Sequence, residues 1–180
     1  VPVKTEKGKL INEIEICDGQ RLFKKFKSFI ETNYSRSRYF KTYSKELFKI
    51  FEIAAAGGRL VELNIQIIKF FIKQLKIKTK IVLSSDLKIN EDRSGKIVNI
   101  CNHFNKNEYL SSYGARHYLQ EDKKIFINKK INAFLHNYQH PEYEQLYTSF
   151  LTNACILDLV FNEGKNSLKI IKKGRKDNIS

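Results

Sequence analysis

The chain has 180 residues, a formal net charge of +14 and 42 % hydrophobic residues, including 13 Phe and 9 Tyr. A chain of this length can bury roughly 70 % of its unfolded surface, so we expect one globular domain and exclude a disordered chain. Its most apolar stretch is interrupted by Glu62, Gln66 and Lys69 and is too polar to span a membrane. The start also lacks the pattern of a signal peptide, so we expect a soluble, cytoplasmic protein.

The positive charge predicts an acidic partner. An anionic small-molecule substrate, a nucleic acid and an anionic membrane face each fit this charge. The lysines are spread along the chain among many Ile and Asn residues, which a codon bias toward A and T also explains. Cys17, Cys101 and Cys155 have no ligand spacing, so we expect reduced, mostly buried thiols and predict neither a metal nor a cofactor.

Residues 1–76 predict an antiparallel hairpin followed by helices. Apolar and charged residues alternate up to Ile16 around a Lys7-Gly8 turn, which is typical of two paired strands. Asp18 then offers a cap for an amphipathic helix, and a second helical pattern runs over about residues 37–56. A third helix follows, with only a narrow polar stripe, and should therefore be largely buried.

Residues 77–180 predict an α/β region. The apolar run 81–83 suits a strand buried on both faces, and a helix starting at residues 90–92 leads to a second strand in "NEYLSS". A third parallel strand is predicted at residues 131–135, and two final helices end at Gly164 and Gly174. The predicted fold class is α/β, a three-layer-like fold with a short, mostly parallel sheet flanked by helices, plus the N-terminal hairpin and helical region.

Ligands of such sheets bind beyond the carboxyl ends of the strands, which lie here at Ser84, at Ser111 and near His140. The stretch "YLSSYGARHYLQ" could hold an anion. Its serines offer hydroxyl groups, Gly114 allows a ligand to come close to the backbone, and Arg116 could form a bidentate contact. Alternatively the motif is a turn that needs Gly114, with Arg116 paired to a surface acid. The pattern alone leaves both interpretations open.

Two further residues are candidates for chemistry. His140, with Tyr143 and Gln145 close in sequence, could act as a general base, or it could be a capping or packing residue. Asp158 stands inside the apolar "ILDLVF" and needs a partner, for which Arg116 is one candidate, unless it lies on an exposed helix stripe.

Five stretches of the chain together resemble the WbqC-like proteins. They occur in the family's order and are "VPVK", "LNIQIIKFFIKQLKIKTKIVLSSDL", "IVNICNHFNKNEYLSSYGARHYL", "HPEYEQLY" and "ILDLVFNEG". The resemblance implies a role in bacterial O-antigen or other surface-polysaccharide assembly, as a transferase of acyl or aminoacyl groups, including glycine. Family members usually begin with a segment resembling His-Gln-Pro-x-Tyr-x-Pro-Trp, so the chain is expected to correspond to the carboxyl-terminal two thirds of one domain, residues 1–180.

The resemblance also implies site residues. His140 and Asp158 take catalytic roles, whereas His117 does not belong to the shared motif. The positions expected to bind substrate are Ser84, Ser111, Gly114, Arg116, Tyr143, Gln145 and Asn162.

Three hypotheses follow. The first is the transferase, with Arg116 and the loop from Ser111 to Gly114 holding an anionic donor. The second is a nucleic-acid-binding module that stacks bases on the aromatic residues of "RLFKKFKSF" and "RSRYFKTYSK", although their helical spacing also fits a core. The third is a noncatalytic remnant that pairs with a partner.

Overall fold

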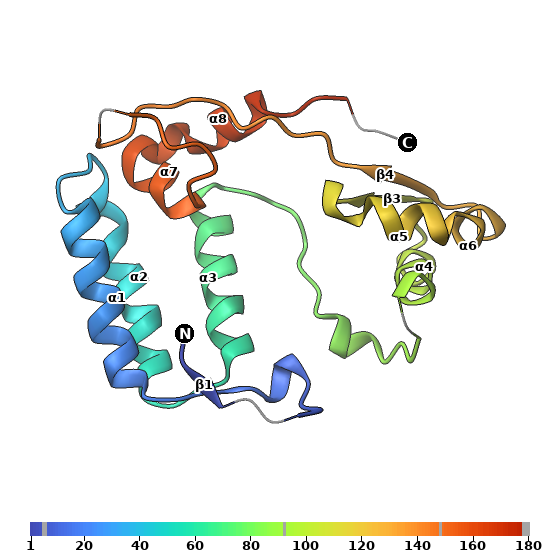
Figure 1. The fold of residues 1–180 in the computed structure, drawn as a ribbon, viewed down its shortest axis with the longest axis horizontal. Coiled ribbons are helices and arrows are strands. Elements are labelled where there is room, and N and C mark those ends of the chain that lie inside the picture. Colours follow the sequence, from blue (N-terminus) through green and yellow to red (C-terminus); the bar gives the residue numbers. More distant parts are fainter. Residues whose placement is uncertain (5–6, 92, 148, 178–180) are drawn as a thin grey trace. The chain divides into compact units, whose positions relative to one another are not determined.

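The computed structural model describes residues 1–4, 7–91, 93–147 and 149–177 (Figure 1). The chain divides into two compact units, each with its own core. Unit 1 comprises Val1–Lys78 and Pro141–Ile171, and unit 2 comprises Thr79–His140 and the segment from Lys172 onward. Each unit is described by itself.

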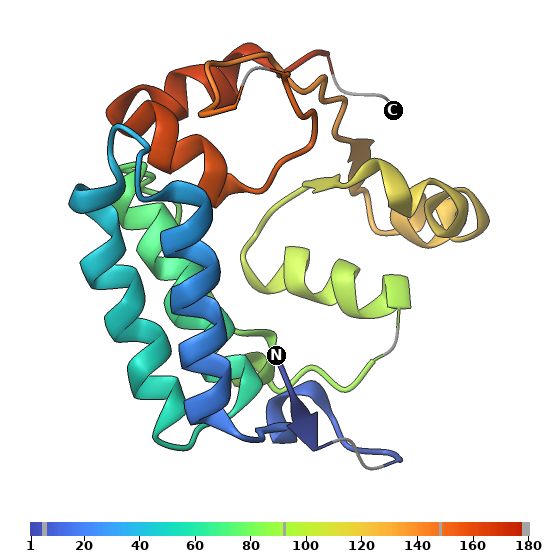
Figure 2. The same ribbon diagram turned by 60° about the vertical axis from the view of Figure 1, so that its left-hand side comes forward.

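Unit 1 is a helical unit that carries the N-terminal strand pair. The α1 and α2 helices lie side by side, and α3 packs against α2 (Figure 2). The helices of this unit are α1 (Gly19–Tyr34), α2 (Phe40–Ala55), α3 (Leu60–Gln74), α7 (Ile156–Glu163), the 3-10 turn η4 (Gly164–Asn166) and α8 (Ser167–Lys173), whose last two residues belong to unit 2.

The core of unit 1 joins residues that are more than a hundred positions apart in the sequence. Phe161 of α7 is 1 % exposed, and its ring centroid lies 5.6 Å from that of Phe40 and 5.4 Å from that of Tyr34. Ile30 and Leu47 are buried in the same cluster. The amphipathic helices predicted from the sequence therefore exist, and their apolar faces converge on α7.

The predicted N-terminal pair of antiparallel strands is confirmed, but its strands are shorter than expected. β1 (Val3–Lys4) pairs with β2 (Glu15–Ile16), and the 3-10 turn η1 (Ile11–Glu13) lies between them. Leu10 was expected inside a strand but is 64 % exposed. The Glu13 carboxylate accepts a hydrogen bond from the Leu10 backbone N–H at 2.8 Å, so the chain makes a capped turn there instead.

The prediction that the third helix is largely buried is wrong. Of the residues in α3, Leu63 and Phe70 are buried, whereas Ile68 is 51 % exposed. A helix with only a narrow polar stripe can still have apolar residues exposed to solvent, because other elements of unit 1 do not pack against all of its apolar surface.

Unit 2 contains the parallel strands. β3 (Glu108–Ser111) and β4 (Asn132–Leu135) pair in parallel, with Ser111 opposite Leu135. Between them the chain forms η3 (Tyr113–Ala115), α5 (Arg116–Glu121) and α6 (Lys123–Asn128), which makes a βαβ unit. The chain is thus a mixed α/β protein with a short parallel sheet, as the sequence predicts.

The strand predicted at residues 81–83 is wrong. Ile81, Val82 and Leu83 form no strand pairing with any described residue and are 43 %, 37 % and 38 % exposed. The 3-10 helix η2 (Ser84–Leu87) starts directly after them. Three apolar residues favour an extended backbone, but a strand also needs a neighbour that donates and accepts hydrogen bonds.

The helix predicted to begin at residues 90–92 is α4 (Arg93–His103). Asp92, one of its expected capping residues, lies outside the described residues. Val98 and Cys101 of α4 are buried with Leu119 and Phe126 in the core of unit 2. Ser94, which is fully buried, donates a hydrogen bond to Asp122 Oδ2 at 2.7 Å and ties α4 to the turn between α5 and α6.

The three cysteines are free thiols. Cys101 is buried and Cys17 half-buried, but Cys155 is exposed, so the expectation of mostly buried thiols fails at Cys155. Among the described helices, none combines the length and the apolar character that crossing a membrane requires.

Candidate functional site

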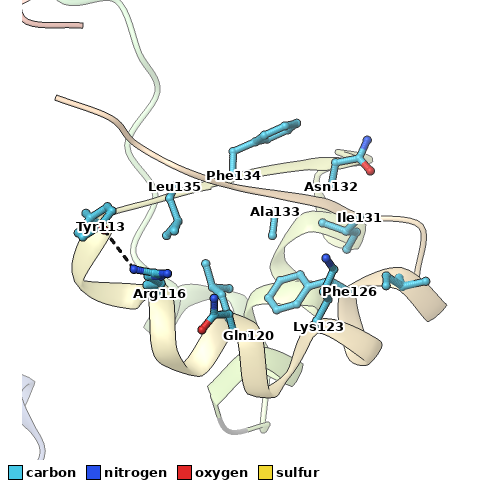
Figure 3. A pocket seen from close by; sticks show the side chains of 12 residues that line it. Tyr113, Arg116, Gln120, Lys123, Phe126, Ile131, Asn132, Ala133, Phe134 and Leu135 are labelled. Carbon is cyan, nitrogen blue, oxygen red and sulfur yellow. Dashed lines mark hydrogen bonds between the residues drawn. The ribbon is translucent and has the colours of Figure 1, made fainter. Parts of the chain in front are cut away.

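A cavity of about 740 Å³ opens in unit 2 next to the parallel strands (Figure 3). This volume is in the range of small-molecule sites. The lining residues come from the helical crossover and from β4, and they are Tyr113, Arg116, Leu119, Gln120, Lys123, Phe126, Ile127, Ile131, Asn132, Ala133, Phe134 and Leu135.

The local structure explains how these side chains reach the cavity. Successive residues of a strand point to opposite faces, and Figure 3 shows Ala133 and Leu135 of β4 directed toward the helices. Leu119 and Phe126 face them from α5 and α6 and are 9 % and 2 % exposed. The floor of the cavity is therefore apolar.

The polar side chains of the cavity lie on one side of the crossover. Arg116 and Gln120 lie four residues apart and therefore share one face of α5, and Lys123 is the first residue of α6, which starts after Asp122. The two cations of the cavity therefore come from different helices of the crossover. The Arg116 guanidinium donates a hydrogen bond from Nη1 to Tyr113 OH at 3.4 Å.

Neither cation is neutralised within the described part of the chain. The ion pairs formed there involve other residues, and no Asp or Glu lines the cavity. The interpretation that Arg116 pairs with a surface acid is therefore wrong for the residues that the structure describes. A guanidinium without an acid partner is available for a carboxylate or phosphate group.

Ser111 ends β3 as predicted, but its hydroxyl is occupied. It accepts a hydrogen bond from Tyr109 OH at 3.0 Å and lies 3.2 Å from Tyr118 OH, and the two tyrosine oxygens are 3.4 Å apart. Ser111 is 7 % exposed, and burial raises the pKa of Tyr109. This hydroxyl cluster of Tyr109, Ser111 and Tyr118 fixes α5 to the end of β3.

Sequence reasoning missed the hydroxyl cluster, although one signal was present. Tyr109 and Ser111 are two residues apart on a predicted strand and so share a face. Tyr118 lies on α5, and it reaches the other two hydroxyls only because α5 packs against β3 in the folded structure. Ser111 does not line the cavity, and its role in binding an anion stays a prediction.

The backbone conformation at Gly114 does not require a glycine. Its φ is not positive, and an added Cβ would meet only Ser112 Oγ, at 3.9 Å. The interpretation that the turn needs a glycine at this position is therefore wrong. A role of Gly114 in admitting a ligand to the backbone stays a prediction.

Ser84 and His140 are placed differently from expectation. Ser84 lies exposed on η2 and does not end a strand, because residues 81–83 are unpaired. His140 follows the end of β4 by five residues, and its half-buried ring stands edge-on to Tyr138 with centroids 6.5 Å apart. The side chains that line the cavity do not include His140.

In unit 1 the structure brings together four other predicted residues. Tyr143 OH and Gln145 Nε2 donate hydrogen bonds to Asp158 Oδ2 at 2.7 and 3.0 Å, and Asn162 Nδ2 donates to the Asp158 backbone oxygen at 2.9 Å. Asp158 is 8 % exposed, so the alternative of an exposed stripe is wrong. Within its own unit, Asp158 therefore has the hydrogen-bond partners that its buried carboxylate needs, and the pairing with Arg116 stays a prediction.

The tyrosines around Asp158 hold their protons firmly. Burial, followed by the hydrogen bond to Asp158, raises the pKa of Tyr143 well above its usual range. Burial and then the charge of Asp158 raise the pKa of Tyr34 as well, a residue that the sequence did not mark as a candidate. Gln145 also accepts from the Leu151 backbone N–H at 2.7 Å, so these contacts hold the segment after Pro141 against α7.

Fold and cavity define a mixed α/β protein that presents a cationic cavity between the crossover helices and β4 of a parallel strand pair. Residues 1–170 match the model of the WbqC-like protein family, and the chain belongs to this family.

One curated relative is "Uncharacterized protein Rv1507c" from Mycobacterium tuberculosis (strain ATCC 25618 / H37Rv). It is 28 % identical to this chain over 167 residues, which are 91 % of this chain and 71 % of the relative. No solved structure matches the chain. The organisation of residues 1–180 as one family domain stays a prediction.

Proposed function

We propose that this protein is a cytoplasmic transferase that moves an acyl or aminoacyl group to a sugar during surface-polysaccharide assembly. The resemblance to the WbqC-like proteins suggests this reaction class. The observation that carries the proposal is the Arg116 guanidinium, which has no acid partner among the described residues and lies at an apolar cavity between the crossover helices and β4.

The chemistry of acyl transfer makes use of such a group. An amine or hydroxyl of the acceptor attacks the acyl carbonyl carbon, the bond to the carrier breaks, and the carrier leaves with the electron pair. A fixed cation that binds the anionic carrier stabilises this developing charge. Arg116 is the proposed carrier-binding group.

The acceptor must lose a proton in this reaction. We propose His140 for this step, because imidazole is the most frequent proton acceptor in enzymes. The roles of Ser84, Asp158 and the residues bonded to it in binding substrate are further parts of the same proposal.

Most of the aromatic residues that suggested the nucleic-acid alternative are used in the core, whereas Phe29 is 59 % exposed. The aromatic residues Phe23, Phe26, Phe40 and Tyr43 belong to the core of unit 1 or pack against it. These four rings are therefore not available for bases to stack on, which makes the nucleic-acid alternative the weaker proposal.

Deletion and complementation test the proposed function. The surface polysaccharide of cells lacking the protein should lose an acyl or aminoacyl substituent, detected by mass spectrometry. The wild type and Lys124→Ala should restore the substituent, whereas Arg116→Ala should not. Lys124 is an exposed cation of α6 that does not line the cavity, which makes it a matched control. An unchanged polysaccharide in the deleted cells would overturn the proposal.

A further inference from the structure

We infer that the cavity of unit 2 binds an acyl chain attached to an anionic group, and that the transferred group is acyl and not aminoacyl. This inference rests on the proposed function and names the donor class. It follows from the floor of the cavity, the charges around it and the absence of acidic side chains among its lining residues.

The floor selects an apolar ligand body. Leu119, Phe126, Ile131 and Leu135 are all at most 9 % exposed, and their side chains offer no hydrogen bond. Sugar hydroxyls placed against them would lose water without gaining a partner, whereas methylene groups gain by leaving water. An acyl chain of several carbons therefore fits this surface better than the sugar of a nucleotide donor.

The charges select the head group. Arg116 of α5 and Lys123 of α6 both line the cavity together with Gln120, and no carboxylate is among the described lining residues (Figure 3). A phosphate or carboxylate can bind to either cation. The ammonium group of an aminoacyl donor would find two like charges and no acid, which disfavours its entry.

Binding of small amphiphiles to the purified full chain tests the inference. Octyl phosphate and octyltrimethylammonium share one chain and differ in the sign of the head group. We expect calorimetry to show octyl phosphate binding at least about tenfold more tightly than octyltrimethylammonium, inorganic phosphate or uridine diphosphate glucose.

Variants locate the binding. The double variant Arg116→Gln/Lys123→Gln should weaken octyl phosphate at least about tenfold, each single variant should weaken it less, and the exposed neighbour control Lys124→Gln should leave it unchanged. Ala133→Leu narrows the cavity from β4 and should weaken octyl phosphate more than ethyl phosphate. Circular dichroism establishes that each variant retains its helices.

Equal affinity for the two octyl probes, or octyl phosphate binding that survives both charge substitutions, would overturn the inference. Tight, Arg116-dependent binding of uridine diphosphate glucose without octyl phosphate binding would replace the acyl donor by a nucleotide sugar. Neither result depends on the polysaccharide analysis. Conversely, an unchanged polysaccharide together with selective octyl phosphate binding would refute the transferase and leave the acyl-anion site standing.

Discussion

Replacing Gly164 by alanine should strongly destabilise unit 1. Gly164 directly follows α7 with φ 51° and ψ −118°, a conformation that L residues rarely adopt. An added Cβ would lie 2.6 to 2.7 Å from three carbon atoms of the Tyr39 ring. Tyr39 cannot easily move away, since its backbone N–H donates to the Phe161 oxygen at 2.9 Å.

The expected magnitude has two parts. Holding a nonglycine residue in this backbone conformation costs about 1 to 3 kcal/mol. Forcing a methyl group into a packed site costs about 1 to 3 kcal/mol more. The free energy of unfolding should therefore fall by about 2 to 6 kcal/mol.

Two other glycines separate these parts. Gly57 has φ 113° and nothing within 4 Å of an added Cβ, so Gly57→Ala should show only the conformational cost. Gly58 has no positive φ, and its nearest contact is 3.6 Å away, so Gly58→Ala should be nearly neutral. Urea unfolding followed by circular dichroism measures all three variants.

A double-mutant cycle isolates the clash. Adding Tyr39→Leu to Gly164→Ala should recover the steric part, which appears as a favourable interaction energy between the two substitutions. If Gly164→Ala proved no more destabilising than Gly57→Ala, or if the cycle gave no interaction energy, the packing of Tyr39 on Gly164 would be refuted.

Two further predictions concern the core and the buried tyrosines. Phe161→Ala should lower the free energy of unfolding by about 3 to 5 kcal/mol, since a fully buried ring leaves a cavity, whereas Phe29→Ala at a 59 % exposed site should change little in the same urea titration. For Tyr34 and Tyr143 the folded-state pKa is raised, so the stability they confer is complete below about pH 10 and is lost as the pH rises beyond it. Alkaline unfolding of Tyr34→Phe should therefore depend less steeply on pH than that of the wild type, and an identical slope would contradict the assignment.

The helices were predictable because their signals are local. The apolar spacing of α1 and α2 and the glycine after α7 belong to single short segments, and each predicted helix is present. The parallel pair β3 and β4 was also predicted from two short apolar runs. Periodicity was sufficient wherever the partner of an element lies nearby in the sequence.

The candidate site was predictable only in part. Arg116 was marked from "YLSSYGARHYLQ", and it does line the cavity. Lys123 and the apolar floor were missed, because an exposed lysine and buried aliphatic residues carry no signal of a site in a lysine-rich chain. Ser111 was marked for its hydroxyl, but two tyrosines engage that hydroxyl once the strand and α5 pack together.

The sequence by itself determined the mixed α/β class, the helices with their glycine ends and the family, and it marked Arg116, which lines the cavity. The tertiary structure decided that residues 81–83 form no strand, that Asp158 is bonded to Tyr143 and Gln145, and that Arg116 shares a cavity with Lys123. The apolar spacing of a helix involves residues three and four positions apart, so a single short segment contains the whole signal. Strand pairing and the partner of a buried carboxylate depend on segments that only folding brings together.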